Sequence, residues 1–252
     1  MAASFPKFVP ILSAYVTRVS GRSLSELISS PAALARALAD TQRVIGHDGV
    51  LCLYQPAALA QCCMTSGGNF CPPDDLPRTG TMAVVLEAAR ALRKQLSPST
   101  HILACFPGPA LMLAELKKSC GREPGELADY DYVGDAFIAT IRAACESGIH
   151  GIAVVEDIPA EPAQELLSLY RSARKLVDFY SCAFCFFLQP GSAVTDSTQF
   201  ADYTFSLPPV GGGFSLVRAR AVSGAAPATT ASDVPPDVSV EALLALREQA
   251  MQ

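Results

Sequence analysis

The sequence contains no tryptophan, and only 17% of its 252 residues are charged. Its net charge is −5 and its basic residues form no stripe, so we expect no binding to nucleic acid. No apolar stretch approaches the roughly 18 uninterrupted residues of a membrane span. The apolar start of the chain holds a single Lys7 together with Pro6 and Pro10, which is unlike a signal peptide. We therefore expect a cytoplasmic protein without membrane contact.

Several sequence motifs are also missing. No GxGxxG follows an apolar run, and GxxxxGK[ST] and GxSxG are absent, which argues against dinucleotide-binding, P-loop and α/β-hydrolase chemistry. The nine cysteines are an odd number, and several lie within apolar runs, as reduced core thiols do. Cys182 and Cys185 have the spacing of a metal-binding pair, but in a strand they point to opposite faces. We expect neither a metal nor a cofactor.

What the sequence does contain is an alternation of short apolar runs and amphipathic helical patterns. Continuous apolar runs of this kind are typical of parallel strands covered by helices on both faces. The pattern predicts an α/β fold, a TIM-like (β/α)8-type barrel with an incomplete or modified last repeat, as one domain over residues 1–252. The expected strands cover residues 10–16, 49–55, 101–106, 151–156, 182–188, 203–207 and 214–222. The expected helices cover residues 23–46 with a break at Pro31, 82–96, 110–118, 132–147, 160–180 and 239–251, and residues 225–236 are expected to form a polar loop.

Two arginines follow the first expected strand. Arg18 and Arg22 lie four residues apart around a glycine-containing turn, and Ser23 and Glu26 then form the capping-box pattern of a helix start. In α/β barrels the loops after the strands carry the chemistry, so the pair would lie on the working face and bind carboxylate or phosphate. The alternative is a surface pair that closes a helix N-terminus.

Further candidate site residues follow the later strands, namely Tyr54, Gln55, Phe106 and Glu156. Tyr54 and Glu156 are candidate proton donors, although Glu156 is also placed to cap a helix. Arg218 and Arg220 are two residues apart on an expected strand and therefore share a face. If that face is the interior, four arginines converge; the alternative is an edge strand with solvated arginines. The three histidines each precede an expected strand, at the end of a barrel that serves stability.

Four stretches resemble, in order, motifs of the uroporphyrinogen decarboxylase family. Residues 17–22 (TRVSGR) resemble its M-R-Q-A-G-R turn, and residues 47–55 (HDGVLCLYQ) are similar to its second strand. Residues 103–109 (LACFPGP) resemble its third strand, and residues 147–157 (SGIHGIAVVED) its fourth. The resemblance covers roughly residues 8–207 and rests on the order of the four stretches.

The resemblance implies a (β/α)8-type barrel from a superfamily of decarboxylases and corrinoid- or thiol-directed methyltransferases. Arg18 and Arg22 match the family's arginines that hold substrate carboxylates. Gln55 stands where the decarboxylase has the aspartate that gathers pyrrole N–H groups. The zinc ligands of the methyltransferase branch, an H-x-C motif and a later cysteine, have no match in this sequence.

Three functions follow as alternatives. The first is a lyase or decarboxylase of a small carboxylated substrate, a tetrapyrrole among the candidates, with Tyr54 or Glu156 as the proton donor. The second is a methyl- or group-transfer enzyme without zinc, and the third is a non-catalytic barrel that binds an acidic ligand or a protein. The expected substrate-binding set is Arg18, Arg22, Gln55, Phe106, Arg218 and Arg220. Because a modified last repeat would leave apolar edges, we also expect a homodimer.

Overall fold

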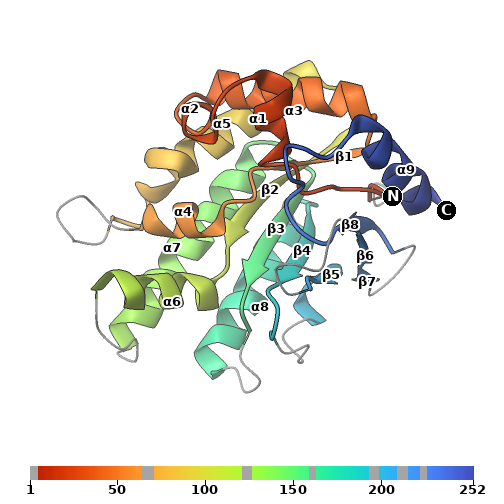
Figure 1. Cartoon of the computed structure of the whole chain (residues 1–252). Helices are drawn as coiled ribbons and strands as arrows, with labels where there is room; N and C mark the ends of the chain where they lie inside the picture. Colours follow the sequence, from red (N-terminus) through yellow and green to blue (C-terminus); the bar gives the residue numbers. More distant parts are fainter. Residues whose placement is uncertain are drawn as a thin grey trace.

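Five parallel strands form the centre of the protein (Figure 1). The computed structural model describes residues 5–63, 71–120, 127–158, 163–192, 199–208, 215–221 and 226–252. The parallel strands lie side by side in sequence order: β1 (Gly49–Cys52), β2 (His101–Pro107), β3 (Gly151–Glu156), β4 (Ala183–Leu188) and β5 (Tyr203–Ser206). All five match expected strands. The α/β prediction and the mostly parallel sheet are therefore confirmed.

Three short strands complete the sheets. β7 (Arg220–Ala221) pairs antiparallel with β5, while β6 (Leu216–Arg218) and β8 (Ala228–Thr230) form a separate antiparallel pair. The N-terminal segment connects this small sheet to the large one. The Val9 N–H donates to the Ala228 carbonyl at 2.9 Å, and the Gly49 N–H donates to the Phe8 carbonyl at 3.2 Å.

The sheets of the described residues differ from the predicted (β/α)8 barrel. They form one six-stranded and one two-stranded sheet, without a regular eight-stranded ring. The first expected strand is wrong, because α1 (Tyr15–Ser20) begins within it and only Phe8 forms a bridge. Pro10 lacks an N–H for strand pairing, and both carboxylate oxygens of Asp233 accept the Ala14 N–H at 3.0 Å where α1 begins. The expected loop 225–236 was also wrong, since it contains β8.

Helices cover one side of the large sheet (Figure 1). The capping box of Ser23 and Glu26 is confirmed, and Pro31 starts a new helix as expected. Besides α1, the helices are α2 (Leu24–Leu27), α3 (Pro31–Ile45), α4 (Pro56–Gln61), the 3-10 turn η1 (Leu76–Arg78), α5 (Gly80–Gln95), α6 (Pro109–Cys120), α7 (Leu127–Glu146), α8 (Gln164–Phe179) and α9 (Val240–Met251).

The core has two main parts, one on each face of the large sheet, and a small third cluster of Phe8, Ala228, Leu246 and Ala250 beside α9. Successive residues of each strand pack on opposite faces of the sheet. Phe106 packs against the helices, whereas Cys105 packs on the other face. Cys182 and Cys185 are divided in the same way, which confirms that they face opposite sides. We call the part away from the helices the inner cluster; it consists of Val9, Ile11, Leu51, Leu103, Cys105, Ala153, Val155, Cys185, Phe187, Phe205, Leu207 and Ala219.

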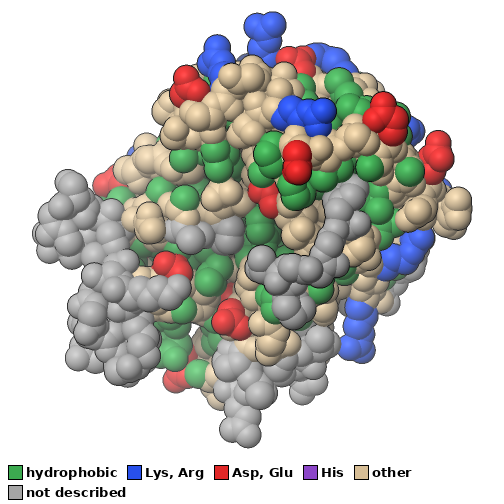
Figure 2. All heavy atoms as spheres, in the orientation of Figure 1, with side chains coloured by type: hydrophobic (Ala, Val, Ile, Leu, Met, Phe, Trp, Pro, Cys, Tyr) green, Lys and Arg blue, Asp and Glu red, His purple; other side chains and the backbone are tan. Residues whose placement is uncertain are grey.

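The surface carries charges of both signs. Figure 2 shows basic and acidic side chains scattered over this face, without a single basic patch. In the part of the chain that the structure describes, no helix is long and apolar enough to cross a membrane.

Candidate functional site

Three polar residues lie at the edge of the sheet formed by the carboxyl ends of its parallel strands. Glu156 ends β3, Tyr54 follows β1 and Gln189 follows β4. In parallel α/β sheets this edge is where ligands bind, because the loops there are free to vary while the strands hold them in place. The candidate site lies at this edge, with the Glu156 side chain on the helix face and Tyr54 and Gln189 joined by a hydrogen bond.

Tyr54 lies over the inner cluster and is held from two sides. Gln189 Nε2 donates to the Tyr54 hydroxyl at 2.9 Å, and the Tyr54 N–H donates to Ser13 Oγ at 2.5 Å. Burial raises the pKa of the Tyr54 phenol well above its usual range, so the hydroxyl keeps its proton. Within the described residues no acceptor takes that proton. A neutral phenol hydroxyl of this kind can donate a hydrogen bond to a ligand.

The backbone just before Tyr54 is strained. Leu53 has a φ of 53°, which lies in the left-handed region that a branched side chain rarely adopts. Such residues cost of order 1–3 kcal/mol and cluster at functional sites. The left-handed conformation of Leu53 turns the chain at the end of β1, and the Tyr54 side chain then reaches Gln189.

Glu156 is fully buried and has four hydrogen-bond donors around it. Tyr170 donates from its hydroxyl at 2.7 Å, and the backbone N–H groups of Ala110, Leu111 and Asp157 donate at 3.1–3.2 Å. Burial raises the pKa of this carboxyl to about 7, against the lowering effect of the hydrogen bonds. The side chain caps α6, which follows β2, instead of the helix after its own strand. Whether it also transfers a proton stays a prediction.

Asp233 is a second carboxyl near this edge that the sequence did not single out. It accepts a hydrogen bond from the Ala14 N–H, and its negative charge helps to raise the pKa of the Tyr54 hydroxyl. Burial raises the pKa of Asp233 to about 7, while its backbone hydrogen bonds lower it. A lone aspartate in a stretch rich in Pro, Ala and Thr carries no motif. Only the contact with residues some 219 positions earlier reveals it.

The arginines do not converge at this edge. Arg18 Nη1 donates to the carbonyls of Pro236 at 3.1 Å and Val238 at 2.6 Å, and Arg218 Nη2 donates to the Gln249 carbonyl at 3.0 Å. Arg22 is exposed in the turn after α1. On β6 and β7, the residues Val217 and Ala219 pack on the inner cluster, so Arg218 and Arg220 face outward. The interior orientation considered for this pair is therefore wrong, and the edge-strand alternative is the one observed.

The remaining predicted residues, Phe106 and Gln55, do not pack on the inner cluster with Tyr54. Phe106 is buried between the sheet and the helices, on the face opposite the inner cluster. Gln55 is half-buried at the start of α4 and makes no capping hydrogen bond with its side chain. The structure thus brings Tyr54 together with Gln189, which the sequence analysis did not include in the site.

The histidines lie at the opposite ends of the strands, as expected. His101 begins β2, and His47 and His150 lie shortly before β1 and β3. The Ile102 N–H donates to His150 Nδ1 at 2.9 Å, and burial is the main cause that lowers the pKa of His150 to about 4. Within the described ranges no group of three His, Cys, Asp or Glu side chains is arranged to hold a metal ion.

Comparison with known proteins gives a likeness of fold. No family model matches the chain. No curated protein matches it either. Among solved structures, a methyltransferase from Methanosarcina mazei aligns with 20% identity and a TM-score of 0.53, over 71% of this chain and 64% of that one. A Group IV chitinase from Ostrinia furnacalis, in complex with allosamidin, aligns with 11% identity and a TM-score of 0.44, over 79% of this chain and 50% of that one.

The methyltransferase shares with this chain an α/β fold with a mostly parallel sheet, and this chain spans just under two thirds of the methyltransferase's length. The class that fold and site define is therefore an α/β protein with a polar edge at the carboxyl ends of its parallel strands.

Proposed function

We propose that this protein is a divergent member of the uroporphyrinogen decarboxylase superfamily that binds a small polar ligand at Tyr54 and catalyses group transfer, with methyl transfer as the first candidate. The observation that carries the proposal is the Tyr54 hydroxyl. It accepts a hydrogen bond from Gln189 and keeps its own proton for a ligand at the edge where such folds place their substrates.

The chemistry of this edge favours a ligand with few charges. A tetrapyrrole carries several carboxylates, and each needs a cation or several donors when it leaves water. Arg18 and Arg218 bind backbone carbonyls, and Arg220 faces outward. Gln55 supplies an amide where a carboxylate would stabilise a developing positive charge. Decarboxylation of a polycarboxylate is therefore the less favoured alternative.

Group transfer needs positioning more than strong acids or bases. In a methyl transfer, the lone pair of the acceptor forms the new bond to carbon. The donor atom keeps the electron pair of the broken bond, and the proton of the acceptor passes to solvent. A neutral phenol that holds one substrate atom in place contributes orientation to such a step. The likeness to a methyltransferase supports this class.

The test is a turnover assay with matched variants. The protein is incubated with methylcobalamin and a panel of small thiols, and loss of the methyl group is followed by absorbance; uroporphyrinogen is offered in a parallel assay. We expect protein-dependent demethylation that falls about tenfold or more in Tyr54→Phe, which loses the donated hydrogen bond. Tyr203→Phe is the control, because Tyr203 stacks on Phe5 at the start of β5, beside Cys185 in the middle of β4.

The other outcomes separate the alternatives. Carboxyl loss from uroporphyrinogen would overturn the proposal in favour of a decarboxylase. A thiol or corrinoid that binds without turnover would favour a non-catalytic binding protein. Equal rates of demethylation in Tyr54→Phe and the unchanged protein would show that the active site does not include Tyr54.

A further inference from the structure

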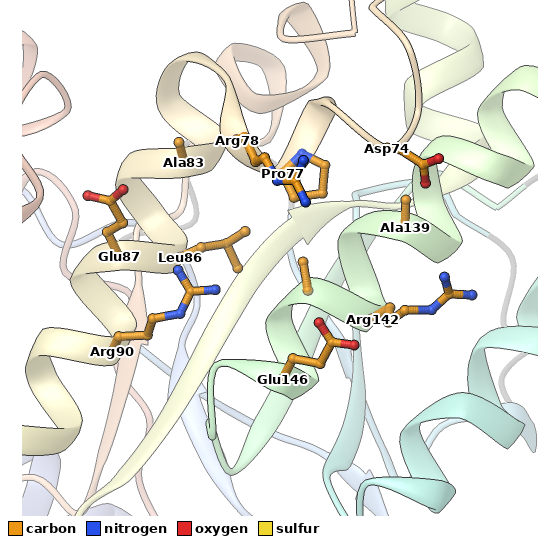
Figure 3. Close-up of a pocket in the computed structure, with 11 residues that line it drawn as sticks. Asp74, Pro77, Arg78, Ala83, Leu86, Glu87, Arg90, Ala139, Arg142 and Glu146 are labelled. Carbon is orange, nitrogen blue, oxygen red and sulfur yellow. The ribbon is translucent and has the colours of Figure 1, made fainter.

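A groove of about 570 Å³ runs between α5 and α7, on the helix side of the sheet (Figure 3). Figure 3 shows β2 passing behind the gap between the two helices. Tyr54 packs with the inner cluster on the opposite face of the sheet, so the groove is separate from the candidate site.

The groove exists because small side chains line it where helices would otherwise meet. Ala83 on α5 and Ala139 and Ala143 on α7 face the gap, and α5 packs on α3 while α7 packs on α8. Leu86 lies beneath them and is almost fully covered. The floor of the groove is therefore apolar, while charged side chains make up most of its lining.

Three arginines from three elements line the groove. Arg78 belongs to η1, Arg90 to α5 and Arg142 to α7. No ion pair joins any of them to a carboxylate among the described residues, whereas Arg174 pairs with both Asp178 and Asp202. In Figure 3 the side chains of Arg78 and Arg90 extend toward the gap. Guanidinium groups match phosphate in a bidentate geometry, so these side chains suit a phosphate group.

Three carboxylates line the same groove, namely Asp74, Glu87 and Glu146. They cancel the formal charge of the three arginines, which disfavours a long polyanion such as nucleic acid. Carboxylates accept hydrogen bonds from hydroxyl groups, and Glu146 already accepts one from the Tyr180 hydroxyl at 3.2 Å. A ligand that carries both phosphate and hydroxyls would satisfy both sets of side chains.

We propose that this groove binds a phosphomonoester with free hydroxyls, either a sugar phosphate or a nucleoside monophosphate. The phosphate lies against Arg78 and Arg90, the hydroxyls donate to the rim carboxylates, and the apolar part of the ligand packs on Ala139 and Ala143. A volume of about 570 Å³ lies within the range of small-molecule sites.

Isothermal titration with four probes tests the proposal: AMP, glucose 6-phosphate, adenosine and inorganic phosphate. We expect AMP or glucose 6-phosphate to bind at least about tenfold more tightly than adenosine and inorganic phosphate. The ester that binds more tightly shows whether the groove prefers a nucleoside monophosphate or a sugar phosphate. Arg78→Gln and Arg90→Gln should each weaken this binding by about tenfold. Arg36→Gln is the control, since Arg36 lies on α3 beside Asp40.

Each contrary result overturns the proposal. Equal binding of inorganic phosphate and the two esters would mean an anion site without recognition of hydroxyls. Equal binding of adenosine and AMP would mean that phosphate is not recognised. Binding that survives Arg78→Gln and Arg90→Gln places the ligand elsewhere, and no binding of any probe at millimolar concentration removes this ligand class. Circular dichroism of each variant verifies that it is folded.

Discussion

The side chain of Glu156 occupies the space that any side chain at residue 108 would need. A Cβ atom added to Gly108 would overlap Oε1, Cδ and Cγ of Glu156. The glycine is required by this close approach, which lets the carboxylate reach the N–H groups of Ala110 and Leu111 at the start of α6. Gly108 and Glu156 therefore form one unit at the edge of the sheet.

Gly108→Ala is the first prediction. The added methyl group would displace a buried carboxylate from its donors, so we expect a loss of about 1–3 kcal/mol in the free energy of unfolding. Chemical denaturation measures it. Gly148→Asn is the control, because Gly148 has a φ of 76° with nothing within 4 Å, and asparagine tolerates that conformation. Equal stability of Gly108→Ala and the unchanged protein would contradict the contact.

Glu156→Gln should change stability in a pH-dependent way. The folded-state pKa of about 7 lies above the usual 4.5, so the contribution of this carboxyl is fully present below pH 4.5 and is lost as the pH rises through 7. The destabilisation caused by Glu156→Gln should thus be larger at pH 4.5 than at pH 8, by roughly 3 kcal/mol at most. Denaturation at both pH values measures this, and a constant difference would contradict it.

His47→Leu should show the opposite pH dependence. His47 is buried, its Nε2 atom has no partner among the described residues, and burial lowers its pKa from 6.5 to about 4. Its contribution is present above pH 6.5 and is lost as the pH falls through 4. The destabilisation caused by His47→Leu should therefore be smaller at pH 4 than at pH 8, by roughly 3 kcal/mol. A larger effect at pH 4 would rule out a buried neutral imidazole.

Arg18→Ala should destabilise the segment that leads into α9. Arg18 donates to the carbonyls of Pro236 and Val238, just before that helix begins. We expect faster amide hydrogen exchange in residues 239–243 and a loss of about 1 kcal/mol in stability. Arg36→Ala on the surface of α3 is the control, since an exposed ion pair contributes little. Unchanged exchange with weakened binding of a carboxylated ligand would instead support the role implied by the family resemblance.

The strands that could be predicted were those whose signal is local. Runs such as residues 101–106 and 151–156 are apolar on both faces and end at turn residues, so the sequence alone indicated β2 and β3. The start of α1 could not be found in this way, because Asp233 supplies its capping interaction from the far end of the chain. β8 was missed because its threonines look like loop residues. Their hydroxyls are buried and bond to Val9 and Ser232 carbonyls at 2.6 and 2.8 Å.

The site was predictable only in part, for a similar reason. Period-two alternation told us that Arg218 and Arg220 share a face, but not which face is outward. The sequence indicated that Glu156 ends a strand, but not that the register of β3 beside β2 places it at the start of α6. Gln189 follows an expected strand and so falls at the same edge, but only the structure shows that it donates to the Tyr54 hydroxyl.

The connection of the N-terminal segment to β8 has a consequence for how the protein folds during synthesis. The Ile11 N–H donates to Thr230 Oγ1, a separation of 219 residues along the chain. The segment around Ile11 therefore has no partner on that side until Thr230 has left the ribosome. Until then the apolar side chains of Val9 and Ile11 lack their final cover, and such late, long-range closure slows folding. Newly made chains should consequently depend on chaperones more than a protein of this size built from local contacts.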